Sequence, residues 1–185
     1  MPSGEPGCDH QAPVQHHAHG GLDVRQTAFS ASRTIRVPRQ AVWDMVADPA
    51  QHHRFDGTGM VGSLASARPT EVGDVFTMNM TYTTGDSRLD YQSDNHVVSL
   101  DPGVCFAWAT ALPGGPPLGW TWRYDLTDGP DGTNVRLSYD WTEAPAHNIA
   151  RFGVPLADPA SLARSLDRLA HTMAAGKRPG GEPRA

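Results

Sequence analysis

The sequence predicts an α+β fold in which a curved antiparallel β-sheet of about seven strands wraps around a long C-terminal α-helix. Three features of the chain support this fold. Apolar and polar residues alternate in several runs between residues 60 and 141, which is typical of strands with one buried face. Two short helical segments follow the first strand, and a long helical pattern covers residues 158–173. With 185 residues, of which 38% are hydrophobic, the chain suits one such domain better than two.

The first strand and the two short helices come early in the chain. Residues Gln26–Val37 are mostly β-branched or small and alternate loosely, which indicates a strand that ends at Pro38. Proline suits a first helical turn, and the apolar stripe over residues 42–46 predicts a helix directly after it. The pair Asp48-Pro49 begins a second short helix that we expect to reach His53.

About six further antiparallel strands are expected, separated by turns rich in glycine and proline. Their ranges are Met60–Leu64, Val75–Tyr82, Leu89–Leu100, Val104–Ala111, Trp120–Leu126 and Val135–Trp141. In the third of these strands, residues 90, 92, 94 and 96 are all polar and should face water. Because side chains alternate between the two faces of a strand, this register turns Tyr91, Ser93 and Asn95 inward.

The strongest helical signal lies near the C-terminus. Asp158 is a favourable N-cap, and Pro159 is favourable at the first helical position. The residues after them place one apolar stripe on the helix, formed by Leu162, Leu166, Leu169, Ala170 and Met173. We therefore expect a helix over residues 158–173 with one face against the sheet.

The two ends of the chain differ in composition from its centre. Residues 1–24 hold much Gly, Pro and His and few large apolar side chains, so they predict a disordered tail. Residues 176–185 predict a second disordered tail, which leaves a globular domain over 25–175. The histidines of the first tail lack an ordered scaffold, so no metal site is expected there. The N-terminus has no apolar segment of the secretory kind, which favours a cytoplasmic protein.

Charge and motifs exclude several function classes. The net charge is −5, from 20 acidic and 15 basic residues, so no surface for nucleic acid is expected. No run approaches the roughly 20 apolar residues of a membrane span, so stable membrane insertion is not expected. The glycine-rich phosphate and dinucleotide motifs and the HExxH and GxSxG motifs are absent, and we expect no cofactor.

The order of several short motifs resembles the START-like (SRPBCC) superfamily, and most closely its bacterial polyketide cyclase/dehydrase-like members. These motifs are Ala31–Pro38, Ala41–Asp44, Ala47–Ala50, His52–Gly57, Trp122–Leu126, Asp131–Val135 and Leu137–Trp141. An aromatic residue, often Trp, precedes the Asp-Gly pair in that family, and Phe55 stands there in this chain. The resemblance covers about residues 27–173. It implies a helix-grip fold with a cavity for an apolar small molecule between the sheet and the long helix. Family members include lipid carriers, cyclases, hormone receptors and co-chaperones.

The expected inward faces carry most of the aromatic residues of the chain, with a few polar ones. The candidate ligand-binding residues are Phe55, Phe76, Met78, Met80, Tyr82, Tyr91, Ser93, Asn95, Trp108, Trp120, Trp122, Tyr124, Tyr139 and Trp141. Each of them, taken alone, could simply fill a core. Together, flat side chains from several strands facing one helix suit a ligand cavity, in which a few polar groups set orientation.

Binding of an apolar or aromatic small molecule, of polyketide, isoprenoid or fatty acyl type, is the leading function. The alternative is a polyketide cyclase or dehydratase, with Tyr91, Tyr124, Tyr139 or His53 as the acid or base. No pair among them has a spacing that marks a catalytic site, so no catalytic residue is assigned. A third possibility is a protein-interaction module on the same fold.

Overall fold

The computed structural model describes residues 26–176. The two predicted tails, with Cys8 and the histidines of residues 10–19, lie almost entirely outside this range. The elements run in the order β1 (Ala28–Ile35), α1 (Arg39–Val46), the 3-10 helix η1 (Pro49–Arg54), β2 (Val61–Leu64), β3 (Val75–Thr84), β4 (Ser87–Asp101), β5 (Cys105–Ala111), β6 (Pro117–Gly129), β7 (Gly132–Asp140), α2 (Ala146–Phe152) and α3 (Pro159–Gly176).

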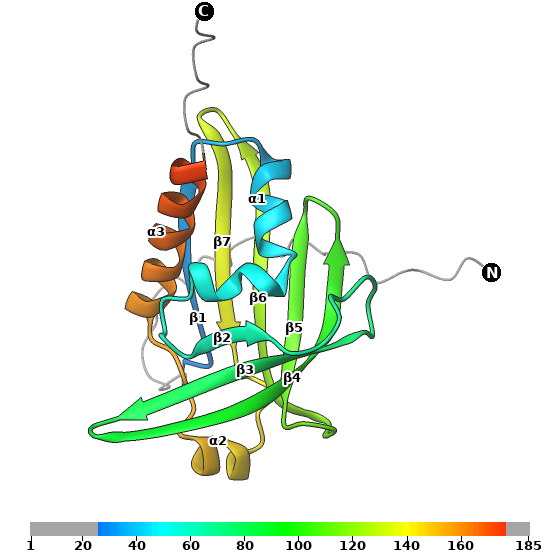
Figure 1. Cartoon of the computed structure of the whole chain (residues 1–185), viewed down its shortest axis with the longest axis vertical. Helices are drawn as coiled ribbons and strands as arrows, with labels where there is room; N and C mark the ends of the chain where they lie inside the picture. The colour runs from blue at the N-terminus through cyan, green and yellow to red at the C-terminus, as the bar shows by residue number, and fades with distance from the viewer. Residues whose placement is uncertain (1–25, 177–185) are drawn as a thin grey trace, which may run out of the picture.

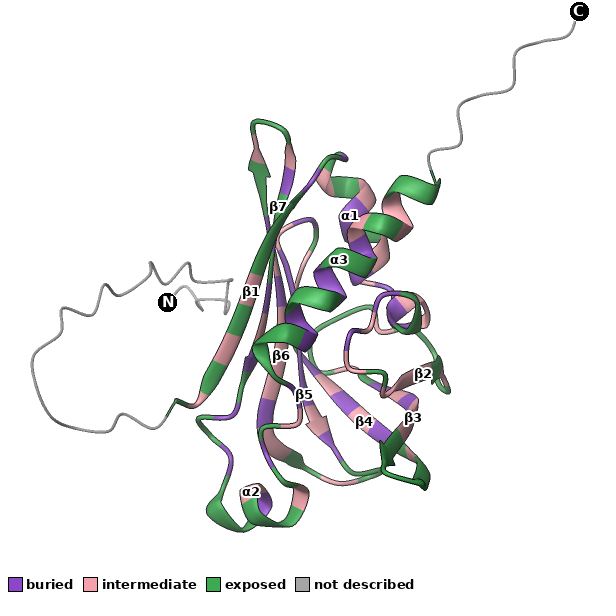
Figure 2. Cartoon of the chain, turned by 90° about the vertical axis from the view of Figure 1, so that its left-hand side faces the viewer, coloured by how far each residue is buried: buried purple, intermediate pink, exposed green. Residues whose placement is uncertain are grey.

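The seven strands form one antiparallel sheet in the order β1-β7-β6-β5-β4-β3-β2. The sheet curls strongly, so that β3 and β4 cross obliquely in front of the nearly vertical β6 and β7 (Figure 1). Helices α1 and α3 lie on the same side of the sheet, and α3 runs along β1 (Figure 2). This arrangement confirms the predicted fold class, including the two short helices after the first strand.

The strand registers place the inward side chains as the alternation predicts. Met78 pairs with Ser93 between β3 and β4, and Trp108 pairs with Trp122 between β5 and β6. Ser93 and Asn95 are buried, whereas Gln92 is exposed. One curved face of the sheet therefore collects the aromatic residues of four successive strands.

Helix α3 begins with a capping arrangement around Asp158. The Asp158 carboxylate accepts a hydrogen bond from the Ser161 backbone N–H at 2.6 Å, and the Ser161 hydroxyl accepts one from the Asp158 N–H at 3.0 Å. Leu162, Leu166 and Leu169 of the predicted stripe are buried against the rest of the core. The amphipathic face therefore fixes α3 on the sheet, as the sequence indicates.

Helix α2 has no counterpart in the sequence analysis. Its seven residues are too few to show a clear periodicity, and its N-cap residue Pro145 makes no side-chain hydrogen bond. The one buried residue is Asn148, whose amide donates a hydrogen bond to the Leu118 carbonyl at 2.9 Å. The helix ends at Gly153, which adopts the left-handed conformation. A contact distant in sequence thus holds this helix, and periodicity cannot reveal such a contact.

Among residues 26–176, no helix combines the length and the apolar character that crossing a membrane requires.

Candidate ligand-binding cavity

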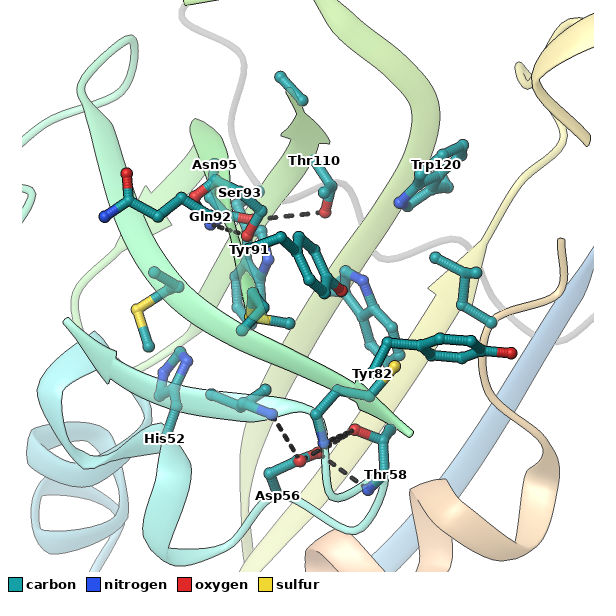
Figure 3. Close-up of a pocket in the computed structure, with 18 of the residues that line it drawn as sticks. His52, Asp56, Thr58, Tyr82, Tyr91, Gln92, Ser93, Asn95, Thr110 and Trp120 are labelled. Atoms are coloured by element: carbon teal, nitrogen blue, oxygen red, sulfur yellow. Dashed lines mark hydrogen bonds between the residues drawn. The ribbon is translucent and has the colours of Figure 1, made fainter. Parts of the chain in front are cut away.

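A cavity of about 460 Å³ lies between the inner face of the sheet, the η1–β2 segment, α2 and α3. All the candidate residues except Tyr139 and Trp141 line it. The lining candidates are Phe55, Phe76, Met78, Met80, Tyr82, Tyr91, Ser93, Asn95, Trp108, Trp120, Trp122 and Tyr124. Phe55 follows η1, and the others come from β3, β4, β5 and β6. Figure 3 shows Asp56 and Thr58 of the η1–β2 segment across the cavity from Thr110 and Trp120. Their role in binding stays a prediction.

The structure does not place Tyr139 and Trp141 in the lining. The ring of Tyr139 stacks against Trp122 with centroids 4.4 Å apart, and Trp141 packs on Phe29 at 4.9 Å. The Tyr139 hydroxyl accepts a hydrogen bond from the Leu156 N–H at 3.3 Å, and burial raises the pKa of this phenol to about 12. Tyr139 therefore supports the cavity wall through Trp122, and Trp141 packs in turn on Tyr139 with centroids 5.1 Å apart.

Several lining residues were not predicted from the sequence, which offered His53 as a possible acid or base. The structure leaves His53 exposed and outside the lining, and it places the neighbouring His52 in the wall. Other missed residues belong to the η1–β2 segment, to α2, to α3 and to the strand ends. They include Asp56, Thr58, Thr110, Leu118, Arg151, Phe152 and Ser165. The motif His52–Gly57 was the one available signal for the first group.

His52 is a neutral, buried part of the cavity wall. Burial among rings lowers its pKa to about 4, against a smaller opposing effect from the hydrogen bond to the Val46 carbonyl. That bond joins the ring Nε2 to the carbonyl oxygen at 2.8 Å, so Nε2 carries the proton and donates it. The ring centroid lies 5.2 Å from Trp108 and 5.5 Å from Phe55. The neutral ring thus acts as a packing group with a fixed orientation.

Asp56 is the acidic side chain of the lining, and its oxygens are already occupied. Its carboxylate accepts hydrogen bonds from the Thr58 N–H at 2.9 Å, the Thr58 hydroxyl at 2.7 Å and the Val61 N–H at 3.0 Å. Figure 3 shows these bonds at the edge of the cavity. The carboxylate therefore shapes the segment between η1 and β2. Within residues 26–176, no cluster of three or more potential ligands could hold a metal ion.

The same segment is attached to α3. The Gly57 N–H donates a hydrogen bond to the Ser165 hydroxyl at 2.8 Å, and the Arg164 guanidinium donates one to the Gly57 carbonyl at 3.2 Å. Arg168 donates another to the Asp56 carbonyl. A side chain on Gly57 would collide with the Ser161 carbonyl, because its Cβ would lie 2.1 Å from that oxygen. Glycine thus allows this wall to lie directly on the helix.

A small polar cluster occupies the β4–β5 side of the cavity. The Asn95 amide donates to the Phe76 carbonyl at 3.4 Å and to the Ser93 carbonyl at 3.3 Å. Its oxygen accepts a hydrogen bond from the Thr110 hydroxyl at 3.3 Å. This buried amide therefore finds its hydrogen-bond partners within the protein.

Two lining tyrosines have raised pKa values. Burial is the main cause for Tyr124, and the negative charge of Asp56 adds to it. Burial also raises the pKa of Tyr91, with a further contribution from Asp56. Both phenols therefore stay protonated at neutral pH and can act as hydrogen-bond donors.

The cavity reaches the surface where its lining residues are exposed. Leu89 and Tyr82, on the β3–β4 hairpin, are 60% and 47% exposed. Leu112 follows β5 and is 38% exposed. Arg151 of α2 lies over the ring of Phe152, 5.0 Å from its centroid, and both residues belong to the lining. The entrance therefore lies between the β3–β4 hairpin, the β5–β6 connection and α2.

The chain is similar to proteins of known sequence and structure. Rv0088 of Mycobacterium tuberculosis is 27% identical over 163 residues, which cover 84% of this chain and 68% of that protein. The structure of Ms6760 from Mycobacterium smegmatis matches with a TM-score of 0.60 at 17% identity, covering 84% of this chain and 96% of that one. The AHSA1-like protein from Aeromonas hydrophila matches with a TM-score of 0.54 at 18% identity, covering 85% and 99%.

The two solved structures confirm the helix-grip fold that the START-like resemblance implies. Residues 26–174 match the family described as polyketide cyclase / dehydrase and lipid transport. This match spans nearly all the residues that form the sheet, the helices and the cavity. The chain therefore belongs to the polyketide cyclase / dehydrase and lipid transport family.

Proposed function

We propose that the protein binds an apolar or aromatic small molecule, of polyketide, isoprenoid or fatty acyl type, in the cavity. The observation that carries this proposal is an unfilled space of about 460 Å³ inside an aromatic wall. Protein interiors normally pack to the density of organic crystals, and unfilled space lowers stability. Pockets for small molecules begin at roughly 300 Å³, so the cavity is large enough for one.

The wall is also rigid enough to present a defined shape. Trp122 is supported from behind by Tyr139, and Trp108 packs on Phe106 at 5.1 Å and on His52. Rings that are fixed before binding lose little conformational entropy when a ligand arrives. An apolar ligand would therefore gain most of the free energy that its burial provides.

Acid–base catalysis is less well supported than binding. A general acid or base works best with a pKa near the operating pH. His52 has its pKa at about 4, the Tyr124 pKa is raised, and the Asp56 carboxylate is occupied by three donors. Binding without chemistry requires none of these groups to titrate, so we favour a binding protein over a cyclase or dehydratase.

Tryptophan emission tests the proposal, because Trp108, Trp120 and Trp122 line the cavity. A panel of fatty acids, isoprenoid alcohols and aromatic ketones should change the emission saturably at micromolar concentration, which corresponds to about −8 kcal/mol. A Ser93→Phe variant, which places a ring in the cavity, should weaken the response while its thermal melt stays cooperative. If no compound of the panel perturbs the emission, the binding proposal fails and a protein-interaction role gains support.

A further inference from the structure

The hydrogen-bond donors of the cavity wall are less fully partnered than its acceptors. Trp120 is 2% exposed, and its indole N–H has no hydrogen-bond partner among the described residues. Tyr124 is 5% exposed and lines the same cavity, and its hydroxyl has no hydrogen-bond partner shown among residues 26–176. A buried donor without a partner costs about 1–3 kcal/mol. The buried Trp120 N–H therefore indicates that a bound molecule supplies its acceptor, and the Tyr124 hydroxyl offers that molecule a second donor from the same strand.

The oxygen acceptors of the lining, in contrast, are largely satisfied. The Asp56 carboxylate accepts three hydrogen bonds, and the Asn95 amide oxygen accepts one from Thr110. The Ser165 hydroxyl donates to the Ser161 carbonyl and accepts from the Gly57 N–H. Inside the cavity, a ligand thus meets more free donors than free acceptors.

Trp120 and Tyr124 both lie on β6 and face the cavity. In Figure 3 the nitrogen of Trp120 is on the side of its ring that faces Thr110 and Tyr91. Four residues along a strand correspond to about 13 Å, so the two donors serve different ends of an elongated molecule. Trp122 lies between them and offers its flat face, because its other face stacks on Tyr139.

Charge near these donors distinguishes a neutral acceptor from an anionic one. Asp56 follows Phe55, whose ring lies 6.2 Å from the Tyr124 ring between centroids, and its negative charge helps to raise the pKa of Tyr124 and of Tyr91. The same charge would repel a carboxylate brought to Tyr124. The one cationic lining side chain, Arg151, lies over Phe152, whose ring packs on Trp120 with centroids 5.5 Å apart, so the repulsion by Asp56 concerns the Tyr124 end of the cavity. A carbonyl oxygen accepts hydrogen bonds without carrying a charge.

We propose that the ligand is a neutral, largely apolar molecule whose carbonyl oxygens accept hydrogen bonds from the Trp120 indole and the Tyr124 hydroxyl. This inference rests on the proposed function and narrows its ligand class to ketones and esters, away from free fatty acids and plain hydrocarbons. Trp120 and Tyr124 are then the residues that orient the ligand, while the other aromatic residues supply contact area.

Calorimetric titration with 9-fluorenone, fluorene and fluorene-9-carboxylate tests this inference, because the three probes share one ring system. The parent protein should bind fluorenone about tenfold more tightly than fluorene, the effect of one net hydrogen bond at a buried donor. The carboxylate should bind more weakly than the ketone. In the double variant Trp120→Phe/Tyr124→Phe, the ratio of ketone to hydrocarbon affinity should fall to about one. The matched control Tyr139→Phe removes a buried hydroxyl outside the lining and should keep the parent ratio.

Infrared spectroscopy of bound fluorenone gives a second measurement that needs no variant. A hydrogen-bonded carbonyl absorbs at lower frequency than the same group in an apolar solvent, and we expect this lower frequency in the parent complex. Equal affinity for fluorenone and fluorene, tighter binding of the carboxylate, or a carbonyl frequency as in apolar solvent would overturn the inference and leave the proposed function standing. Failure of both neutral probes and of the whole emission panel would instead overturn the proposed function.

Discussion

His52 shows at the residue scale how burial becomes a pH dependence. Its pKa falls from 6.5 to about 4 in the folded state, mainly because burial disfavours the charged ring. Between these pH values the unfolded chain binds a proton that the folded chain does not bind. The free energy of unfolding should therefore decrease as the pH falls from about 6.5 to 4, by about 3 kcal/mol in total from this residue.

Urea denaturation at a series of pH values measures this contribution. The variant His52→Gln removes the titrating ring and should show a flatter profile over the same pH range. His53→Gln changes the adjacent, exposed histidine and should follow the parent profile. Parallel profiles for the parent and His52→Gln would show that His52 does not cause the acid sensitivity.

Gly57 provides a steric prediction at the same scale. Its φ is not positive, so an added Cβ acts through contact alone, at 2.1 Å from the Ser161 carbonyl and 2.6 Å from the Ser165 nitrogen. Gly57→Ala should lower the free energy of unfolding by about 1–3 kcal/mol, because the η1–β2 segment must move away from α3. Gly176→Ala, where nothing lies within 4 Å, should change it by less than about 0.5 kcal/mol in the same denaturation assay. Equal effects of the two changes would contradict the close approach of segment and helix.

Single residues were predictable from the sequence where the alternation fixed them. Ser93 and Asn95 are buried as expected, because a strand offers only two faces. The choice between His52 and His53 could not be made, since both stand in a 3-10 helix too short to show a periodicity. Only the packing of η1 against the aromatic cluster decides which of the two rings is buried.

At the scale of elements, α3 should depend on its buried leucine stripe. Leu166 is 1% exposed and belongs to the core cluster. Leu166→Ala should lower the free energy of unfolding by about 2–5 kcal/mol, the usual cost of a cavity at a buried leucine. His171→Ala, on the exposed side of the same helix, should change it by less than about 0.5 kcal/mol. A comparably small effect of both substitutions on chemical denaturation would show that α3 is not a wall of the core.

The elements differ in how clearly the sequence encodes them. Strands β3 to β7 and helix α3 have their own periodic patterns, and these patterns placed them within a few residues of their observed bounds. Helix α2 is held by the bond from Asn148 to the Leu118 carbonyl and by the ring contact between Phe152 and Trp120, 5.5 Å between centroids. Contacts of this kind are absent from local sequence patterns, so one cavity wall was not predicted.

At the scale of the whole molecule, the sequence could indicate which aromatic residues face inward but not whether they meet. Tyr139 and Trp122 share an inward face, yet their rings stack and only Trp122 reaches the cavity. Whether facing rings fill a space or surround it depends on the curvature of the sheet and the position of α3. The balance between a filled core and an open cavity is therefore a property of the folded chain as a whole.

Native mass spectrometry of the protein, purified without detergent and then mixed with 9-fluorenone, tests most directly whether the cavity is a ligand site. We expect a one-to-one complex, or a co-purified molecule in its place, that dissociates on collisional activation. The Ser93→Phe variant should show markedly less of the complex at equal protein concentration. If the parent protein carries no bound molecule and takes up neither fluorenone nor any compound of the panel, the space of about 460 Å³ is not a binding site for small apolar molecules.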